Sequence, residues 1–220
     1  MLQILSLKTV GDLSSVTSIS EKVFDGCTAL TTVGDLSSLK VVPDRLFFYT
    51  SNLVQINIPS TVEYIGADAF WYSGVSEVTF NVTPSGVEKT PLVMGDGVFY
   101  NCNGLYEIAL PERLAYVPYQ AFYQCKNLEK VVIPTTVTNN GSDGTRAIGK
   151  EAFKLCSNLS TVEFTKGGDL PLSFGGLAFE DCTSLKTLSL PKRASSLDSS
   201  KYDLFELGGG KYYSVNKNVY

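Results

Sequence analysis

Apolar residues recur along this chain in one pattern, which is repeated about eight times. Each copy is anchored by a phenylalanine, with apolar residues eight, five and one positions before it, as Val62, Ile65 and Ala69 stand before Phe70. The spacings between these phenylalanines are 23, 23, 29, 23, 31, 26 and 26 residues: Phe24, Phe47, Phe70, Phe99, Phe122, Phe153, Phe179 and Phe205. A period of this length indicates a repeat architecture.

Each repeat unit predicts three short elements. The segment 53–58 ends in alternating polar and apolar residues, which predicts a short strand with one face inward. A proline closes this run in several units, since proline cannot donate a further ladder bond: Pro59, Pro111, Pro134 and Pro191. The segment 62–66 predicts a shorter extended piece with a turn. The segment 121–125 predicts a single helical or 3-10 turn that brings Phe122 into the core.

The repeat predicts a solenoid, because no single unit can bury its own apolar face. Stacked units with strands about 4.8 Å apart would form a rod on the order of 35 Å long. We expect one solenoid of about eight coils over residues 1–207, with atypical first and last coils. Residues 208–220 are expected to be a C-terminal tail or a final cap strand.

The repeat unit resembles the BspA-like leucine-rich repeats. The match is carried by Leu53 to Pro59 followed by Val62 to Phe70, and the units from Leu105 to Phe122 and from Leu128 to Phe153 follow it. The resemblance covers roughly residues 2 to 205. It implies a leucine-rich-repeat solenoid, a right-handed curved superhelix with parallel strands. It also implies surface-exposed or secreted proteins of host-associated bacteria and some protozoa, often linked to adhesion, without a catalytic motif.

Composition narrows the function classes. The chain has no histidine, which removes the commonest general base and metal ligand and excludes Ser-His and Cys-His nucleophile pairs. Its net charge is −4 and it has no basic run, so we expect no nucleic-acid partner. No apolar stretch approaches the roughly 20 residues of a membrane helix, and the N-terminus lacks the signal-peptide pattern. We therefore expect a monomeric, non-catalytic protein without cofactors and without membrane insertion.

Five cysteines occupy one repeat position, three residues after the phenylalanine: Cys27, Cys102, Cys125, Cys156 and Cys182. An odd number of cysteines could combine disulfides with a free thiol. Equivalent positions in stacked coils should instead place the side chains in parallel, which favours a ladder of buried thiols that act as small apolar groups. A metal site is less favoured, because the spacing lacks paired ligands.

Outward positions of the predicted main strands form the first candidate binding surface. These residues are small, polar and of mixed charge: Gln55, Asn57, Glu77, Thr79, Glu107, Lys130, Thr161 and Glu163. The alternative is a plain solvated sheet, because few aromatic residues stand there. A second candidate is the inserted loop with Asn140 and Asp143, which equally fits a tolerated surface loop. This loop lacks the carboxylates and the terminal glutamate of a calcium loop.

Aromatic residues gather just after the core phenylalanine in neighbouring units: Phe48, Tyr49, Trp71, Tyr72, Tyr100 and Tyr123. Stacked coils would align them in a stripe. Such a stripe could bind carbohydrate or a partner, or it could continue the packing between coils, and packing is the favoured reading.

These observations lead to a functional hypothesis with one alternative. We expect an extracellular or cell-surface module for protein interaction or adhesion, which binds a host protein or glycan. The alternative is a structural spacer or scaffold segment of a larger cell-surface protein. Repeat solenoids often bind partners, but fold alone does not fix function.

Overall fold

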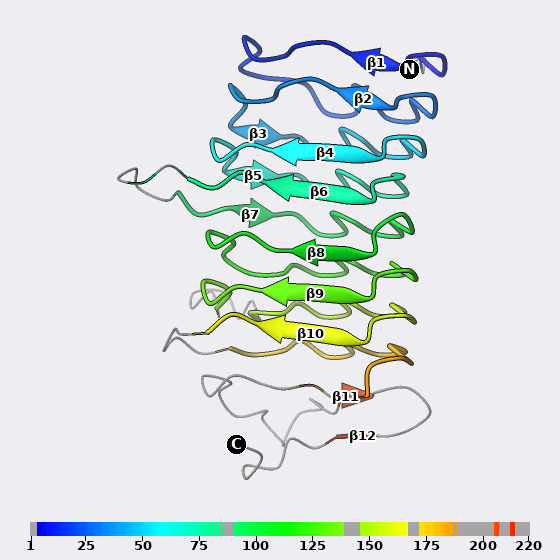
Figure 1. Ribbon diagram of the computed structural model, residues 1–220, viewed down its shortest axis with the longest axis vertical. Helices are drawn as coiled ribbons and strands as arrows, with labels where there is room; N and C mark the ends of the chain where they lie inside the picture. Colours follow the sequence, from blue (N-terminus) through cyan, green and yellow to red (C-terminus); the bar gives the residue numbers. More distant parts are fainter. Residues whose placement is uncertain are drawn as a thin grey trace.

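The computed structural model describes residues 4–83, 85, 90–138, 146–166, 172–186 and 188, and the backbone of the strands at 205–206 and 212–213. The strands lie one above another along a single rod (Figure 1). The chain winds around the rod, so that each repeat unit forms one coil and adds one layer to the stack, as the sequence predicts.

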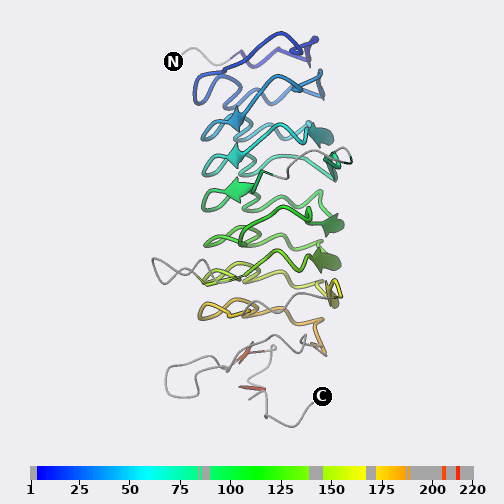
Figure 2. The ribbon, with the colours of Figure 1, turned by 90° about the vertical axis from the view of Figure 1, so that its left-hand side faces the viewer.

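Two columns of parallel strands run along the rod, and they lie on opposite sides in Figure 2. We call the first column the main face: β1 (Thr9–Val10), β2 (Thr32–Val33), β4 (Gln55–Ile58), β6 (Glu77–Phe80), β8 (Glu107–Ala109), β9 (Lys130–Ile133) and β10 (Thr161–Phe164). The second column, the rear face, contains β3 (Val41–Val42), β5 (Tyr64–Ile65) and β7 (Val93–Met94). Isolated parallel bridges continue the rear face, for example Val117 with Ile148.

The strand register keeps equivalent repeat positions side by side. Ile108 pairs with Val131, and Val131 pairs with Val162, all three buried. The same parallel register joins β4 to β6 and β3 to β5. Because side chains alternate between the two faces of a strand, this register turns every second position inward along the whole column.

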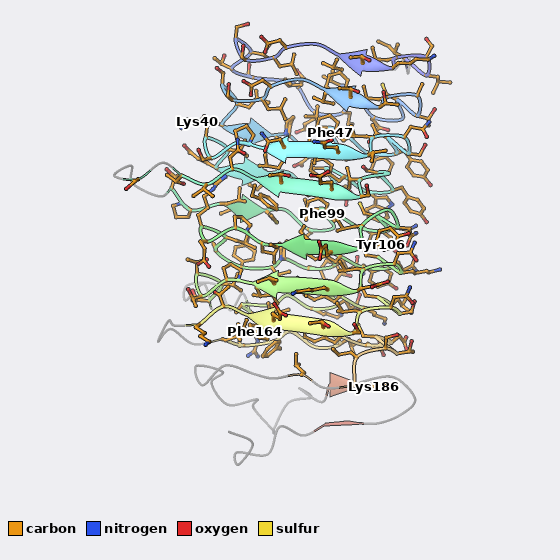
Figure 3. All side chains as sticks on the ribbon, in the orientation of Figure 1. Lys40, Phe47, Phe99, Tyr106, Phe164 and Lys186 are labelled. Carbon is orange, nitrogen blue, oxygen red and sulfur yellow. The ribbon has the colours of Figure 1, made fainter. Side chains whose placement is uncertain are left out.

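The core contains an unbroken stack of seven phenylalanine rings. Neighbouring rings have centroids 5.1–5.7 Å apart and stack nearly parallel, from Phe24 to Phe179. Figure 3 shows the side chains that fill the rod, among them the fully buried Phe47 and Phe99. Buried leucines, valines and isoleucines surround the rings in one continuous cluster. Each coil thus buries its apolar face against its neighbours.

The cysteines form the predicted ladder, since all five are buried and free. The ladder is also hydrogen-bonded. The thiols of Cys102 and Cys125 donate to the carbonyl oxygens of Phe70 and Phe99 on the preceding coil, at 2.9 and 3.0 Å. Cys156 and Cys182 repeat this contact at 3.0 and 3.1 Å. The position therefore supplies a small apolar volume together with a donor for a buried carbonyl.

We expect the thiols to resist thiol reagents in the folded protein. Burial raises the pKa of Cys125 and of Cys182 to about 12, and it raises the pKa of Cys102 well above its ordinary value. Few thiolates therefore exist at pH 8. Counting thiols with Ellman's reagent should give almost none before denaturation and five after it. Rapid reaction of more than one thiol in the native protein would contradict the ladder.

The segment around each core phenylalanine is not the predicted helical or 3-10 turn. The residues two before and two after the phenylalanine have positive φ, for example 55° at Asp68 and 54° at Tyr72 around Phe70. The described residues contain no helix. The segment instead forms overlapping β-turns, in which the amides of Ala69, Trp71 and Ser73 donate to carbonyls three residues earlier.

The physical reason is that every second amide of this segment donates a hydrogen bond to the next coil. The amides of Asp68, Phe70 and Tyr72 donate to the carbonyls of Asp96, Val98 and Tyr100 on the next coil, at 2.9 Å in each case. A helical turn would direct every amide along its own axis. The turn with left-handed residues divides its amides between its own coil and the next one, so the stack gains hydrogen bonds at this edge as well.

The eighth phenylalanine differs from the others. Phe205 lies in β11 (Phe205–Glu206), which pairs antiparallel with β12 (Tyr212–Tyr213), whereas the first seven phenylalanines lie in turns. β12 falls within the segment 208–220, for which the sequence left a tail or a final strand open. The domain boundary at 207 and the right-handed superhelix remain predictions.

Candidate interaction surfaces

The main face brings the sequence-predicted residues together. Gln55 lies beside Glu77 and Asn57 beside Thr79, while Glu107, Lys130 and Thr161 follow one another on the three paired strands. Glu163 forms an ion pair with Lys130 at 2.9 Å, and both side chains are largely exposed. An exposed pair of this kind contributes at most about 1 kcal/mol. The main face is thus an open, polar sheet.

The loop candidates Asn140 and Asp143 lie outside the described residues. Within the part of the chain that is described, no group of three or more His, Cys, Asp or Glu side chains could hold a metal ion.

The aromatic stripe forms a surface along the turns, which we call the aromatic edge: Phe48, Tyr49, Trp71, Tyr72, Tyr100 and Tyr123. Trp71 stacks on Tyr100 with centroids 3.8 Å apart, and Tyr100 stacks on Tyr123 at 4.7 Å. In a second column, Tyr49 stacks on Tyr72 at 4.8 Å. The rings therefore pack between coils, as the sequence favours. Tyr49 and Tyr72 nevertheless remain 44% and 38% exposed.

Cations stand at both ends of the first aromatic column. The Arg45 guanidinium lies 3.9 Å from the centroid of the Phe48 ring and forms an ion pair with Asp25 at 3.0 Å. At the other end, Lys154 follows Tyr123 in the column and forms an ion pair with Glu180. A cation over an aromatic face is favourable, so the contact between Arg45 and Phe48 stabilises this end of the column.

Three aspartates stand just before the core phenylalanines of neighbouring coils: Asp44, Asp68 and Asp96. Burial raises the pKa of Asp68, the nearby Arg45 opposes this shift, and the charges of Asp44 and Asp96 add to it. Burial also raises the pKa of Asp96. Gly97 lies between Asp68 and Trp71, because a Cβ there would lie 2.6 Å from Oδ1 of Asp68 and 3.5 Å from the Trp71 ring.

The sequence matches one known family of repeats. Six copies of the BspA type leucine-rich repeat match residues 3–90 and 140–207 of the chain. The chain belongs to this family. Repeats of this family are typically non-catalytic interaction scaffolds, and no enzyme family is indicated by any match.

Solved structures of bacterial leucine-rich-repeat proteins show the same fold. A leucine-rich repeat protein of T. pallidum is 25% identical, with 81% of this chain and 72% of that chain covered and a TM-score of 0.60. One from Bacteroides ovatus is 22% identical, with a TM-score of 0.56; 84% of this chain is covered, but only 49% of that one. No curated protein matches the sequence.

Other coils of this BspA-type solenoid show which residues can replace the rings of the aromatic edge. The position after the core phenylalanine carries Asp25, Lys154 and Glu180 in other coils, and the next position carries Gly26, Asn101, Gln124, Leu155 or Asp181. These coils stack their phenylalanines just as closely, with Phe153 and Phe179 at 5.2 Å. The fold therefore does not require aromatic residues at these positions, although it accommodates them.

Arg113 is a buried residue of this BspA-type solenoid that sequence reasoning missed. Its guanidinium donates to the carbonyl oxygens of Val62 and Pro59, two coils away. It thereby spans the intervening coil, in which the long segment 81–91 departs from the repeat. Burial lowers the pKa of Arg113, and the charge of Glu63 opposes this shift. Arg113 satisfies two carbonyls and acts as a structural staple.

We expect Asp68→Asn to stabilise the solenoid at neutral pH by up to about 1 kcal/mol, since solvent screens a partly buried charge. The folded pKa of Asp68 is raised, so its carboxylate lowers stability as pH rises through that pKa, and protonation at lower pH relieves the loss. Asparagine also tolerates the φ of 55°. Urea titrations at pH 7 and below pH 4 should show the gain shrinking on acidification. A gain independent of pH would exclude the charge as its cause.

Proposed function

We propose that this chain is a non-catalytic interaction module, secreted or displayed at the cell surface, that binds a host protein or glycan. The family supports an interaction scaffold. The single observation that carries the proposal is the aromatic edge, because its rings are partly exposed where the other coils hold no aromatic residue. Specialised side chains that the fold does not need are expected where a surface binds.

The proposal includes a monomer that neither binds nucleic acid nor enters a membrane. Dispersed charge with a net value of −4 supports the exclusion of nucleic acid. In the described part of the chain, no helix is long and apolar enough to cross a membrane. The surface location rests on the resemblance to BspA-like proteins.

Two measurements test the proposed function. The purified protein is screened against arrays of extracellular-matrix proteins and glycans, and antibodies locate the native protein in fractionated cells. We expect at least one saturable ligand and a signal in the surface or secreted fraction. A cytoplasmic signal together with two empty arrays would refute the proposal.

The main face favours a second function, a structural spacer in a larger cell-surface protein. It presents small polar residues and a solvated ion pair, with none of the aromatic anchors of a binding centre in its two outward columns. In a spacer, ligand binding would belong to other domains. Domain-by-domain binding assays on the full gene product distinguish the two functions.

A further inference from the structure

We propose that the aromatic edge is the partner-binding surface of this chain, and that its partner is a protein presenting a basic segment rich in arginine or lysine. The inference rests on the proposed function, for which it names the surface and the chemistry of the ligand. This surface differs from the main face and the inserted loop, the first two candidate binding surfaces that the sequence indicates.

The composition of the aromatic edge matches the centre of a protein interface. Tryptophan, tyrosine and arginine dominate interface hot spots. The edge holds the single tryptophan of the chain, Trp71, four of its tyrosines and the stacked Arg45. The rings are fixed by contact with one another, with interplanar angles of 8–14° in the three tight stacks. A rigid surface loses little side-chain entropy when a partner binds.

The ring geometry favours a protein over a glycan. A sugar packs its C–H face against an open aromatic face, but both faces of Tyr100 are occupied, by Trp71 and Tyr123. Phe48 has the Arg45 guanidinium over its ring and the tilted Trp71 ring beside it. This column therefore offers no run of open ring faces to a glycan, whereas its tyrosines carry hydroxyl groups that can form hydrogen bonds. These groups suit the hydrogen-bonding donors and aliphatic stems of a protein segment.

The charge beside the rings selects a basic segment. The charges of Asp44 and Asp96 add to that of Asp68, and Arg45 is the cation that counters them there. Arg45 is itself paired with Asp25. The contacts around Gly97 place the Asp68 carboxylate next to Trp71. A partner cation would thus find the Asp68 carboxylate close to the Trp71 ring, and its charge would be complementary.

Arg45 shows on this molecule how such a cation would sit. Its guanidinium combines a ring face, that of Phe48, with a carboxylate, that of Asp25. In the second column, the residue before Tyr49 is Gly26 on the preceding coil, which has no side chain. Tyr49 is accordingly the most exposed ring of the edge. We place the first arginine or lysine of the partner over Tyr49.

Trp71 provides the readout, because it is the only tryptophan and lies within the edge. Its fluorescence is followed while the full chain is titrated with a synthetic peptide of alternating arginine and serine. Glutamate–serine peptide and a neutral cello-oligosaccharide are titrated in parallel. We expect saturable binding of the arginine peptide alone, weakening as salt is added. No saturation by the basic peptide, or saturation by the oligosaccharide instead, would overturn the proposal.

Two double variants locate the binding. Tyr49→Asn with Tyr72→Asn introduces the residue that Asn101 already supplies in this column, and asparagine tolerates the positive φ. Asp68→Asn with Asp96→Asn removes two carboxylates. Each pair should weaken peptide binding by about tenfold or more. The control pair, Glu112→Gln with Glu129→Gln, removes the same charge from exposed positions outside the aromatic edge. Equal losses in the control and the Asp68/Asp96 pair would reduce the effect to net charge and overturn the proposal.

The same variants separate this inference from the proposed function. They are tested against any protein ligand that the matrix arrays identify. A ligand whose affinity is unchanged by both edge variants would overturn the inference while leaving the interaction module intact. Arrays without any ligand, combined with a cytoplasmic location, would remove the proposed function itself. Circular dichroism melting confirms that each variant is folded before its affinity is compared.

Discussion

Phe99→Ala is expected to lower the free energy of unfolding by about 3–5 kcal/mol, the usual loss when a buried phenylalanine is truncated. Phe99 is fully buried, with ring centroids 5.1 Å from Phe70 and 5.3 Å from Phe122. Its removal opens a cavity in the middle of the stack and leaves two neighbours without a stacking partner. Urea denaturation followed by circular dichroism measures the loss.

Phe24→Ala is the matched control, because Phe24 ends the described stack. It has one stacked neighbour, Phe47 at 5.7 Å, and is 9% exposed. We expect a smaller loss there, of about 2 kcal/mol, since part of the space is open to water and less surface is buried. Equal losses at the two positions would show that stability does not depend on neighbouring coils, contrary to the behaviour of a repeat stack.

The core was predictable because the repeat samples each position many times. The inward places of Ile56, Leu105 and Phe122 follow from their recurrence at fixed offsets, and all three are buried. The cysteine ladder follows from the same logic. One accidental apolar residue says little, whereas the same residue type at the same offset in successive units indicates a shared environment.

The turn conformation was not predictable from the same pattern. Left-handed φ values normally signal glycine or asparagine, but Arg45, Gln120 and Leu155 adopt them here. The sequence of one turn looks compatible with a helix, because the deciding hydrogen bonds run to the next coil. Tertiary contacts of this kind override local propensity and leave no mark within the segment itself.

The candidate surfaces were likewise predictable only in part. Strand alternation correctly places Gln55, Glu77 and Lys130 on the outward side of the main face. The sequence also aligns the aromatic residues, but it cannot supply the 3.8 Å stacking of Trp71 on Tyr100. Arg113 was missed because its partners lie 51 and 54 residues earlier in the chain. Such contacts depend on how an irregular coil folds, and no periodicity encodes them.

Gly74→Ala is expected to lower the free energy of unfolding by about 3 kcal/mol, because overpacking against backbone forces neighbouring coils apart. A Cβ at Gly74 would lie 2.1 Å from the carbonyl oxygen of Ser51 on the preceding coil. That atom belongs to the backbone, so no side-chain rotation can relieve the clash. A Cβ at Gly104 would likewise lie 2.4 Å from the Gly74 carbonyl oxygen, so a displaced Gly74 would disturb the next layer as well.

Gly176→Ala isolates the steric cause, because a Cβ at Gly176 would meet nothing within 4 Å. The two substitutions remove the same glycine freedom from the unfolded chain, a change that by itself stabilises slightly. We therefore expect Gly176→Ala to shift stability by no more than about 0.5 kcal/mol. Urea denaturation of both variants gives the comparison. Similar stabilities would mean that the coils can separate at little cost, and the close backbone approach at Gly74 would then not set the spacing of the stack.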